Sequence, residues 1–387
     1  MKTPSPWLTV MRATTLVCIL TLSRSAQTQG QDTATSKTHE VHSDGSITFR
    51  FKDRGASKVQ LRLEGQPKPL DMQKSGAEDW SVTTPPVPPE IYGYSFDVDG
   101  QPRLDPKNPV ITPNLVSRSN LVTVPGSSPQ LWEATDVPHG ILYHHFYTSK
   151  VVTGLDRGQS DYFVYTPAGY DPKASSPYPV LYLLHGFSDT PAAWTAVGQA
   201  HFILDNLIAQ GKVKPMVVVM PMGYGDMNFV NRGFSAWDDD AAIDRNVSLF
   251  GKALLTEILP QVEANYSVSK DRKNRAITGL SMGGLESLII GLHDTDQFAW
   301  IGGFSSAVKK LRYQELFPDL DAKKADLRLL WIACGREEDL ITPNRKLVAW
   351  LRTKNMPVTA VETPGMHTWM VWRDNLIHFA PLLFHNQ

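Results

Sequence analysis

The chain has 387 residues, of which 42% are hydrophobic and 20% are charged, and its formal net charge at pH 7 is −1. This length is comfortable for two domains. The charge balance is not basic enough to favour nucleic acid or an anionic membrane surface as a partner.

The N-terminus has the pattern of a secretory signal peptide. Lys2 and Arg12 precede an apolar run of ten residues at 13–22, and small residues continue after it through Ala26. This order of regions is typical of signal peptides, whereas a helix that spans a bilayer needs about twice as many apolar residues. We therefore expect a signal peptide over residues 1–26, secretion to the periplasm or the medium, and no membrane association after cleavage.

The two cysteines fall on different sides of the predicted cleavage site. Cys18 lies inside the predicted signal peptide, which leaves Cys334 as the only cysteine expected in the mature chain. A disulfide within one mature chain is then impossible, so we expect the exported protein to fold without one.

Residues 39–126 are predicted to form a small β-sandwich. Apolar and polar side chains alternate there, which is the period of strands with one buried face. Turn signals such as Glu64-Gly65 and Asp99-Gly100 separate these stretches, and many short strands of this kind fit a sandwich. The alternating stretches are 47–51, 59–63 and 92–98. Residues 127–138 are expected to be a linker.

The remaining segment, 139–387, alternates strands with helices. Continuous apolar runs at 180–184 and 216–220 are typical of strands buried on both faces. Later strands are predicted at 329–333 and 358–362. Repeated units of strand and helix predict an α/β class domain with a mostly parallel, doubly wound sheet and helices on both faces.

The segment Gly279-Leu280-Ser281-Met282-Gly283 reads G-x-S-x-G. A β-prone stretch precedes it at 275–278, and a stretch with a broad apolar helical face follows at 284–293. A serine between glycines at a strand-to-helix turn is the arrangement that lifts its hydroxyl above the sheet of an α/β-hydrolase. Ser281 is therefore the predicted nucleophile.

A serine hydroxyl needs a base to take its proton, and in this fold the order along the chain is serine, acid, histidine. His367 follows the predicted strand 358–362 through a short loop, and we expect it to be the base. The other histidines, His185 among them, lie in positions that favour structural or solvated roles.

The acid is expected in the loop Arg336-Glu337-Glu338-Asp339, directly after a predicted strand. Three carboxylates lie in this loop, but only one can face the imidazole and hold it in the right tautomer. From the loop alone, Glu338 and Asp339 both remain candidates.

Two backbone amides are predicted to stabilise the oxyanion of the tetrahedral intermediate. One belongs to Met282, directly after the nucleophile, and the other to Phe187, where Gly186 lets the backbone approach closely. The run Asp238-Asp239-Asp240 is expected to be a solvated loop, and neither a metal nor a cofactor is predicted.

Together these residues resemble the esterase D-like branch of the α/β-hydrolases, in particular the feruloyl and acetylxylan esterases of carbohydrate esterase family 1. An additional segment, 88–94, followed by Asp99-Gly100 and Asp105-Pro106, resembles the early-set sandwich (similar to carbohydrate-binding module family 48) that often precedes this catalytic domain. The matching motifs of the catalytic part are Leu183-Leu184-His185-Gly186, Trp194, Met220-Pro221-Met222-Gly223-Tyr224-Gly225, the glycine-rich segment 279–284 and Gly365-Met366-His367-Thr368-Trp369.

The resemblance implies a secreted serine esterase that removes feruloyl or acetyl groups from plant cell-wall xylan through an acyl-enzyme on Ser281. The partner would be an ester-decorated polysaccharide or oligosaccharide. Family members usually carry aspartate at the position of Glu338, which favours Glu338 as the acid and keeps Asp339 as the alternative. The expected substrate-binding residues are Phe187, Met282, Trp369 and Trp237.

Other functions remain open from the sequence. A catecholate siderophore lactone is the second candidate substrate, acyl transfer to a sugar acceptor is the third reaction, and a non-catalytic glycan-binding protein is the alternative outside enzymes. Trp80, Tyr92 and Tyr94 could stack on sugars, although aromatic residues at alternate strand positions also suit a core.

Overall fold

The computed structural model describes residues 38–309 and 312–385, and the chain from Thr38 onward forms one compact unit. The signal peptide predicted over residues 1–26 lies outside the described residues. Within the described ranges, no helix is long and apolar enough to cross a membrane.

The N-terminal part is a sandwich of two antiparallel sheets, as predicted. One sheet has the order β1-β2-β6-β5; the other has the order β4-β3-β7-β8, and β9 also pairs with β7. Phe49 and Tyr94 meet between the sheets with ring centroids 4.8 Å apart. The strands are β1 (His39–Val41), β2 (Ile47–Lys52), β3 (Val59–Leu63), β4 (Leu70–Asp71), β5 (Gln73–Ser75), β6 (Asp79–Thr83), β7 (Glu90–Val98), β8 (Gln101–Arg103) and β9 (Asn120–Val124).

The three aromatic residues considered for sugar stacking belong to this core. Trp80, Tyr92 and Tyr94 are 6%, 3% and 1% exposed. The Tyr94 hydroxyl also donates a hydrogen bond to Asp105 at 2.8 Å. These rings pack the two sheets together and present no surface on which a sugar could stack.

The second part is built on an eight-stranded sheet with the order β10-β11-β13-β12-β14-β15-β16-β17. The first two pairings are antiparallel, and all later ones are parallel. This order confirms the predicted α/β-hydrolase fold. The strands are β10 (Ile141–Thr148), β11 (Gln159–Thr166), β12 (Val180–Leu184), β13 (Val217–Pro221), β14 (Arg275–Gly279), β15 (Trp300–Phe304), β16 (Leu329–Gly335) and β17 (Val358–Thr363).

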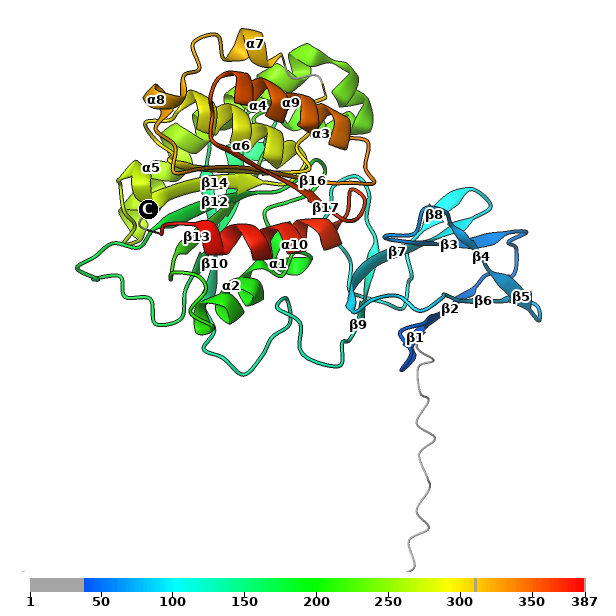
Figure 1. Ribbon diagram of the computed structural model, residues 1–387. Helices are drawn as coiled ribbons and strands as arrows, with labels where there is room; N and C mark the ends of the chain where they lie inside the picture. The colour runs from blue at the N-terminus through cyan, green and yellow to red at the C-terminus, as the bar shows by residue number, and fades with distance from the viewer. Residues whose placement is uncertain (1–37, 310–311, 386–387) are drawn as a thin grey trace, which may run out of the picture. The chain divides into compact units, whose positions relative to one another are not determined.

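Helices cover both faces of this sheet (Figure 1). One face carries α1, α2 and α10, and the other carries α4, α6 and α9, each over a separate apolar core. The helices are α1 (Ala193–Ala196), α2 (Ala200–Ala209), α3 (Met227–Asn231), α4 (Asp240–Ala253), α5 (Leu259–Asn265), α6 (Met282–His293), α7 (Tyr313–Leu316), α8 (Ala322–Ala325), α9 (Ile341–Thr353) and α10 (Trp369–Phe379).

Arg373 on α10 links the hydrolase part to the sandwich. Its side chain is 0% exposed, and its guanidinium donates to the carbonyls of Val197 at 2.7 Å and Ile91 at 2.8 Å. Glu90 supplies the opposite charge at 2.9 Å. A buried cation of this kind requires such partners because its desolvation is costly, so β7 and α10 are held together at a fixed point.

Parallel strands bring their carboxyl ends to the same edge of a sheet. The loops that follow β12, β14, β16 and β17 therefore gather at one edge, and these are the loops in which the catalytic residues were predicted.

Candidate active site

Ser281 occupies the sharp turn between β14 and α6. Its backbone has φ 52° and ψ −110°, a sparsely populated conformation that is maintained only where the surrounding structure requires it. The flanking glycines allow the turn: a Cβ at Gly279 would lie 2.6 Å from the carbonyl carbon of Gly283, and one at Gly283 would lie 2.5 Å from the oxygen of His185. The G-x-S-x-G pattern is therefore required by close backbone packing.

His367 lies between Ser281 and Glu338. Its Nε2 is 3.0 Å from the Ser281 hydroxyl oxygen, and its Nδ1 is hydrogen-bonded to the Oε2 of Glu338. A carboxylate at Nδ1 keeps the proton on that nitrogen, which leaves Nε2 free to accept the proton of the serine hydroxyl.

The carboxylate of Glu338 is enclosed by donors. Its Oε1 accepts hydrogen bonds from the Ser305 hydroxyl at 2.6 Å, the Cys334 thiol at 3.1 Å and the Gly335 amide at 2.5 Å. Burial by itself would raise the pKa of Glu338, but the bonds from His367 and these donors outweigh it and hold the pKa below its ordinary value. Glu338 is therefore a buried, charged carboxylate. Sequence reasoning did not identify Ser305, because it is more than thirty residues away in the chain.

The two neighbouring carboxylates, of Glu337 and Asp339, do not face His367. Asp339 and Glu337 are exposed, and Glu337 accepts a hydrogen bond from the backbone amide of Gly365, in the loop that carries His367. Of the three carboxylates in this loop, the structure places that of Glu338 against the imidazole.

The two predicted oxyanion donors belong to residues close to Ser281. A Cβ at Gly186 would be 3.4 Å from the Cβ of Ser281, so the loop after β12 passes directly beside Ser281. Met282 begins α6, where the first amides have no partner within the helix. In the described part of the chain, neither the Phe187 amide nor the Met282 amide donates to another residue.

His185 fixes this loop and is not placed to act as a base. Its Nδ1 bonds the carbonyl of Gly186 at 2.8 Å, and its Nε2 accepts from the amide of Gly223 at 2.9 Å. Burial lowers the pKa of His185 to about 4. The neutral ring thus ties the loop after β12 to the loop after β13.

The sandwich also binds the loop after β12. The side-chain amide of Asn114 donates to the Ser188 hydroxyl at 2.8 Å and to Asp189 at 2.9 Å. The backbone amide of Leu115 donates to the Ser188 carbonyl at 2.6 Å. Burial raises the pKa of Asp189 to about 7, so this acid lies between its charged and neutral forms near neutral pH.

The predicted substrate-binding residues fall into two groups. The half-buried ring of Phe187 meets Phe234 and Trp237, with centroids 5.3 and 5.7 Å away, and these rings form an aromatic wall beside the oxyanion loop. In contrast, the Met282 side chain is fully buried, so it offers a backbone amide and no apolar surface. Trp369 is 8% exposed and packs against other aromatic rings.

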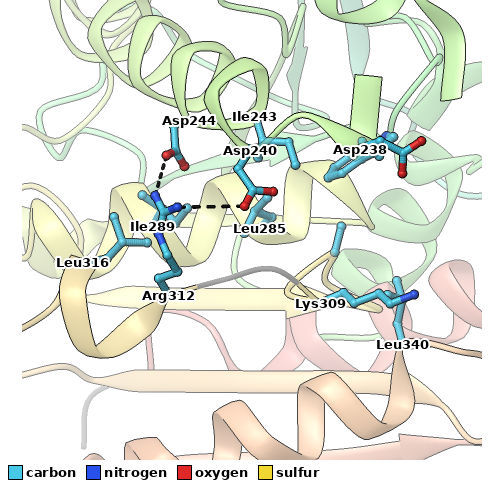
Figure 2. Close-up of a pocket in the computed structure, with 12 residues that line it drawn as sticks. Asp238, Asp240, Ile243, Asp244, Leu285, Ile289, Lys309, Arg312, Leu316 and Leu340 are labelled. Carbon is cyan, nitrogen blue, oxygen red and sulfur yellow. Dashed lines mark hydrogen bonds and ion pairs between the residues drawn. The ribbon is translucent and has the colours of Figure 1, made fainter. Parts of the chain in front are cut away.

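A cavity of about 280 Å³ opens next to the aromatic wall. Figure 2 shows its apolar side formed by α4 and α6, while Arg312 pairs with Asp240 and Asp244 at the rim. Two of its lining residues, Leu285 and Ala307, donate backbone amides to the Ser281 carbonyl, at 3.0 and 2.9 Å, so the cavity lies close to the start of α6.

A second cavity, of about 440 Å³, is mainly polar and lies where the sandwich meets the hydrolase part. Glu64 and Asn114 line it from one side, and Asp189 and Trp369 line it from the other.

The acidic run beside Trp237 has structural roles. Asp239 caps α4 by accepting the amide of Ala242 at 3.1 Å and pairs with Arg232 at 2.9 Å. Among the described residues, no group of three or more His, Cys, Asp or Glu side chains is arranged to hold a metal ion.

The chain is similar to known esterases. A sequence model of the family described as "Putative esterase" matches residues 158–383. An endo-1,4-beta-xylanase/feruloyl esterase of Xylanibacter ruminicola is 28% identical over 355 residues, which cover 89% of this chain and 45% of that protein. An acetyl esterase of Caldicellulosiruptor saccharolyticus is 25% identical over 228 residues, which cover 50% of this chain and 78% of that protein. The chain thus spans less than half the length of the first relative.

Among solved structures, the enterochelin esterase of Shigella flexneri has a similar fold. The TM-score is 0.66 at 18% identity, and the match covers 90% of this chain and 95% of that one. The likeness therefore includes the N-terminal sandwich as well as the eight-stranded sheet.

Proposed function

The chain belongs to this esterase family, and we propose that it is a carboxylic ester hydrolase whose reaction is carried out by Ser281, His367 and Glu338. The observation that supports this assignment is the continuous chain of hydrogen bonds from the serine hydroxyl through the imidazole to a buried carboxylate. We propose further that the protein is secreted and removes feruloyl or acetyl groups from plant cell-wall xylan.

In the proposed mechanism, the Ser281 hydroxyl oxygen attacks the ester carbonyl while His367 Nε2 takes its proton. The amides of Phe187 and Met282 stabilise the oxyanion that forms. His367 then protonates the departing alcohol, and an acyl group remains on Ser281. Water, deprotonated by the same imidazole, releases the acid and restores the serine.

Two features support an aromatic acyl group. The wall of Phe187, Phe234 and Trp237 offers ring surfaces, and the cavity next to it, which Trp237 also lines, has an apolar side on α4 and α6. Apolar cavities with a few polar groups at the rim are typical of small-molecule sites. An acetyl group would leave most of this space unfilled, so we rank feruloyl first.

The second candidate substrate is a catecholate siderophore lactone. The fold likeness to the enterochelin esterase, which extends over the sandwich, is the observation that favours it. A catecholate ring could also fill the cavity of about 280 Å³, so the cavity alone does not separate the two substrates.

A product assay separates these functions. Purified protein is incubated with methyl ferulate, acetylated xylan and a triscatecholate lactone, and the Ser281→Ala variant serves as the blank. Ferulate or acetate release that is lost in the blank supports the plant-wall esterase. Cleavage of the lactone alone would replace that proposal with a role in iron acquisition.

A further inference from the structure

The first turn of α10 is capped by a residue of the sandwich. Glu64, which directly follows β3, accepts the backbone amide of Trp369 at 2.8 Å with one carboxylate oxygen and that of Gly93 at 2.9 Å with the other. Trp369 is the first residue of α10 and lies about three hundred residues further along the chain. Glu64 thus connects the sandwich to the helix that begins two residues after His367.

This contact replaces a cap that α10 lacks locally. The amides at the start of a helix have no partners within it and are usually satisfied by the side chain of the preceding residue. Thr368 holds that position, but its side chain makes no capping hydrogen bond. The negative charge of Glu64 also suits the positive end of the helix dipole.

Other contacts also hold the first turn of α10 against the sandwich. Met370 packs against the sandwich core. Gly65 has φ +79°, and a Cβ there would lie 2.7 Å from the terminal carbon of Met370. A side chain at this position would push the end of the Met370 side chain away, and the positive φ also favours glycine. Glu64 and Gly65, recognised in the sequence as a turn, therefore form the surface that receives α10.

The turn held in this way contacts the base. The Trp372 ring meets the His367 imidazole edge to face at 4.9 Å, and Trp369 packs against Trp372 at 5.3 Å. A shift of α10 would therefore move Trp372 and the loop that carries His367 with it.

We propose that Glu64 is a positioning residue for His367: by capping α10 from the sandwich, it keeps the imidazole at hydrogen-bond distance from Ser281. This inference rests on the proposed role of Ser281 and His367 in ester hydrolysis. It gives the sandwich a part in catalysis that needs no sugar binding. Glu64 acts through α10 and makes no contact with the reacting atoms.

The test compares Glu64→Gln with Glu78→Gln at a temperature where both variants are folded. Glu78 is a matched control because it lies in the same sandwich and pairs only at the surface, with Lys52 at 3.1 Å. The readouts are kcat and KM for p-nitrophenyl acetate, and the melting temperature. We expect kcat of Glu64→Gln to fall about 10- to 100-fold, since small misplacements of catalytic groups cost up to about that factor. KM should change less than about twofold, and Glu78→Gln should match the wild type.

A local cap separates helix capping from the link to the sandwich. Thr368→Asp added to Glu64→Gln places a carboxylate at the N-cap of α10, which can stabilise the helix but does not tie it to Gly93. We expect it to raise the melting temperature and to leave kcat low, and full recovery of kcat would contradict the role of the sandwich. Should Glu64→Gln fail to fold, Glu64→Asp, which retains the charge but is one methylene shorter, is measured in its place with the same expectation.

Two other results would overturn the inference. A folded Glu64 variant with wild-type kcat, beside an inactive Ser281→Ala, would remove the role of Glu64 and leave the proposed hydrolysis intact. If the Ser281→Ala variant turned over substrate as fast as the wild type, both the role of Glu64 and the proposed hydrolysis would be removed.

Discussion

Glu338 uses its two carboxylate oxygens differently: Oε1 accepts from Ser305, Cys334 and Gly335, while Oε2 faces His367. Glu338→Gln loses the charge that stabilises the imidazolium and can present an amide to Nδ1. We expect kcat on an activated ester to fall by about 10⁴-fold, the scale known for loss of the triad acid.

Asp339→Asn is the matched control for this variant, because Asp339 is adjacent and exposed. We expect its kcat to stay within about twofold of the wild type. A larger loss in Asp339→Asn than in Glu338→Gln would transfer the acid role to Asp339.

Asp189 should make stability depend on pH. Burial raises its pKa from 3.8 to about 7 in the folded protein, so the folded state holds this proton more tightly than the unfolded chain. The stability that this bound proton contributes is fully present below about pH 4. It is lost as the pH rises towards 7, and the free energy of unfolding then falls by up to about 4 kcal/mol. We expect Asp189→Asn, which can still accept from Asn114, to lose less stability than the wild type between pH 5 and pH 8 in urea titrations. An unchanged pH dependence would contradict this prediction.

On α6, the cavity next to the aromatic wall predicts a variant that discriminates between large and small acyl groups. Ile289 lines the cavity and lies two turns beyond Ser281, so Ile289→Phe should fill space without touching the serine. We expect kcat/KM for methyl ferulate to fall at least about tenfold, while that for p-nitrophenyl acetate changes little, because a small acyl group does not need the cavity. Equal losses on both esters would show that the cavity is not the acyl site.

The elements that form the catalytic edge were largely predictable from the sequence. The apolar run at 180–184 coincides with β12, and the run at 216–220 lies within one residue of β13. Both were predictable because strands buried on both faces have no polar positions to obscure the pattern. The turn around Ser281 was equally accessible, because its glycines are required by contacts within a few residues.

Contacts between distant segments were not predictable in this way. Glu64 and Asn114 looked like ordinary residues of a turn and a loop, and their partners lie about 300 and 75 residues away. Ser305 similarly has no local signal for its bond to Glu338. Motifs report short-range geometry, whereas these residues obtain their roles from how the sandwich and the sheet pack.

For the molecule as a whole, the buried pair of Arg373 and Glu90 should couple the sandwich to the hydrolase part. Arg373→Met leaves the carboxylate of Glu90 buried without a cation, which typically costs about 3–5 kcal/mol. We expect the free energy of unfolding in urea to fall by about that amount. The double variant Arg373→Met/Glu90→Gln should be less destabilised than the single one.

Arg345→Met serves as the control for this prediction. Arg345 pairs with Glu362 at the surface, with side chains 57% and 42% exposed, and such pairs contribute about 1 kcal/mol or less. An Arg373→Met variant as stable as Arg345→Met would show that the buried pair does not couple the two parts.

The link between Arg373 and Glu90 also limits how such proteins can recombine. Residues 127–138 look like a natural place for genes to exchange a catalytic segment. An exchange there would combine Arg373 with a foreign sandwich, and unless that sandwich offered an acid and a carbonyl at matching places, the cation would be buried without partners. In this chain, an exchanged sandwich is therefore expected to be tolerated only where it again offers Arg373 an acid and a backbone carbonyl.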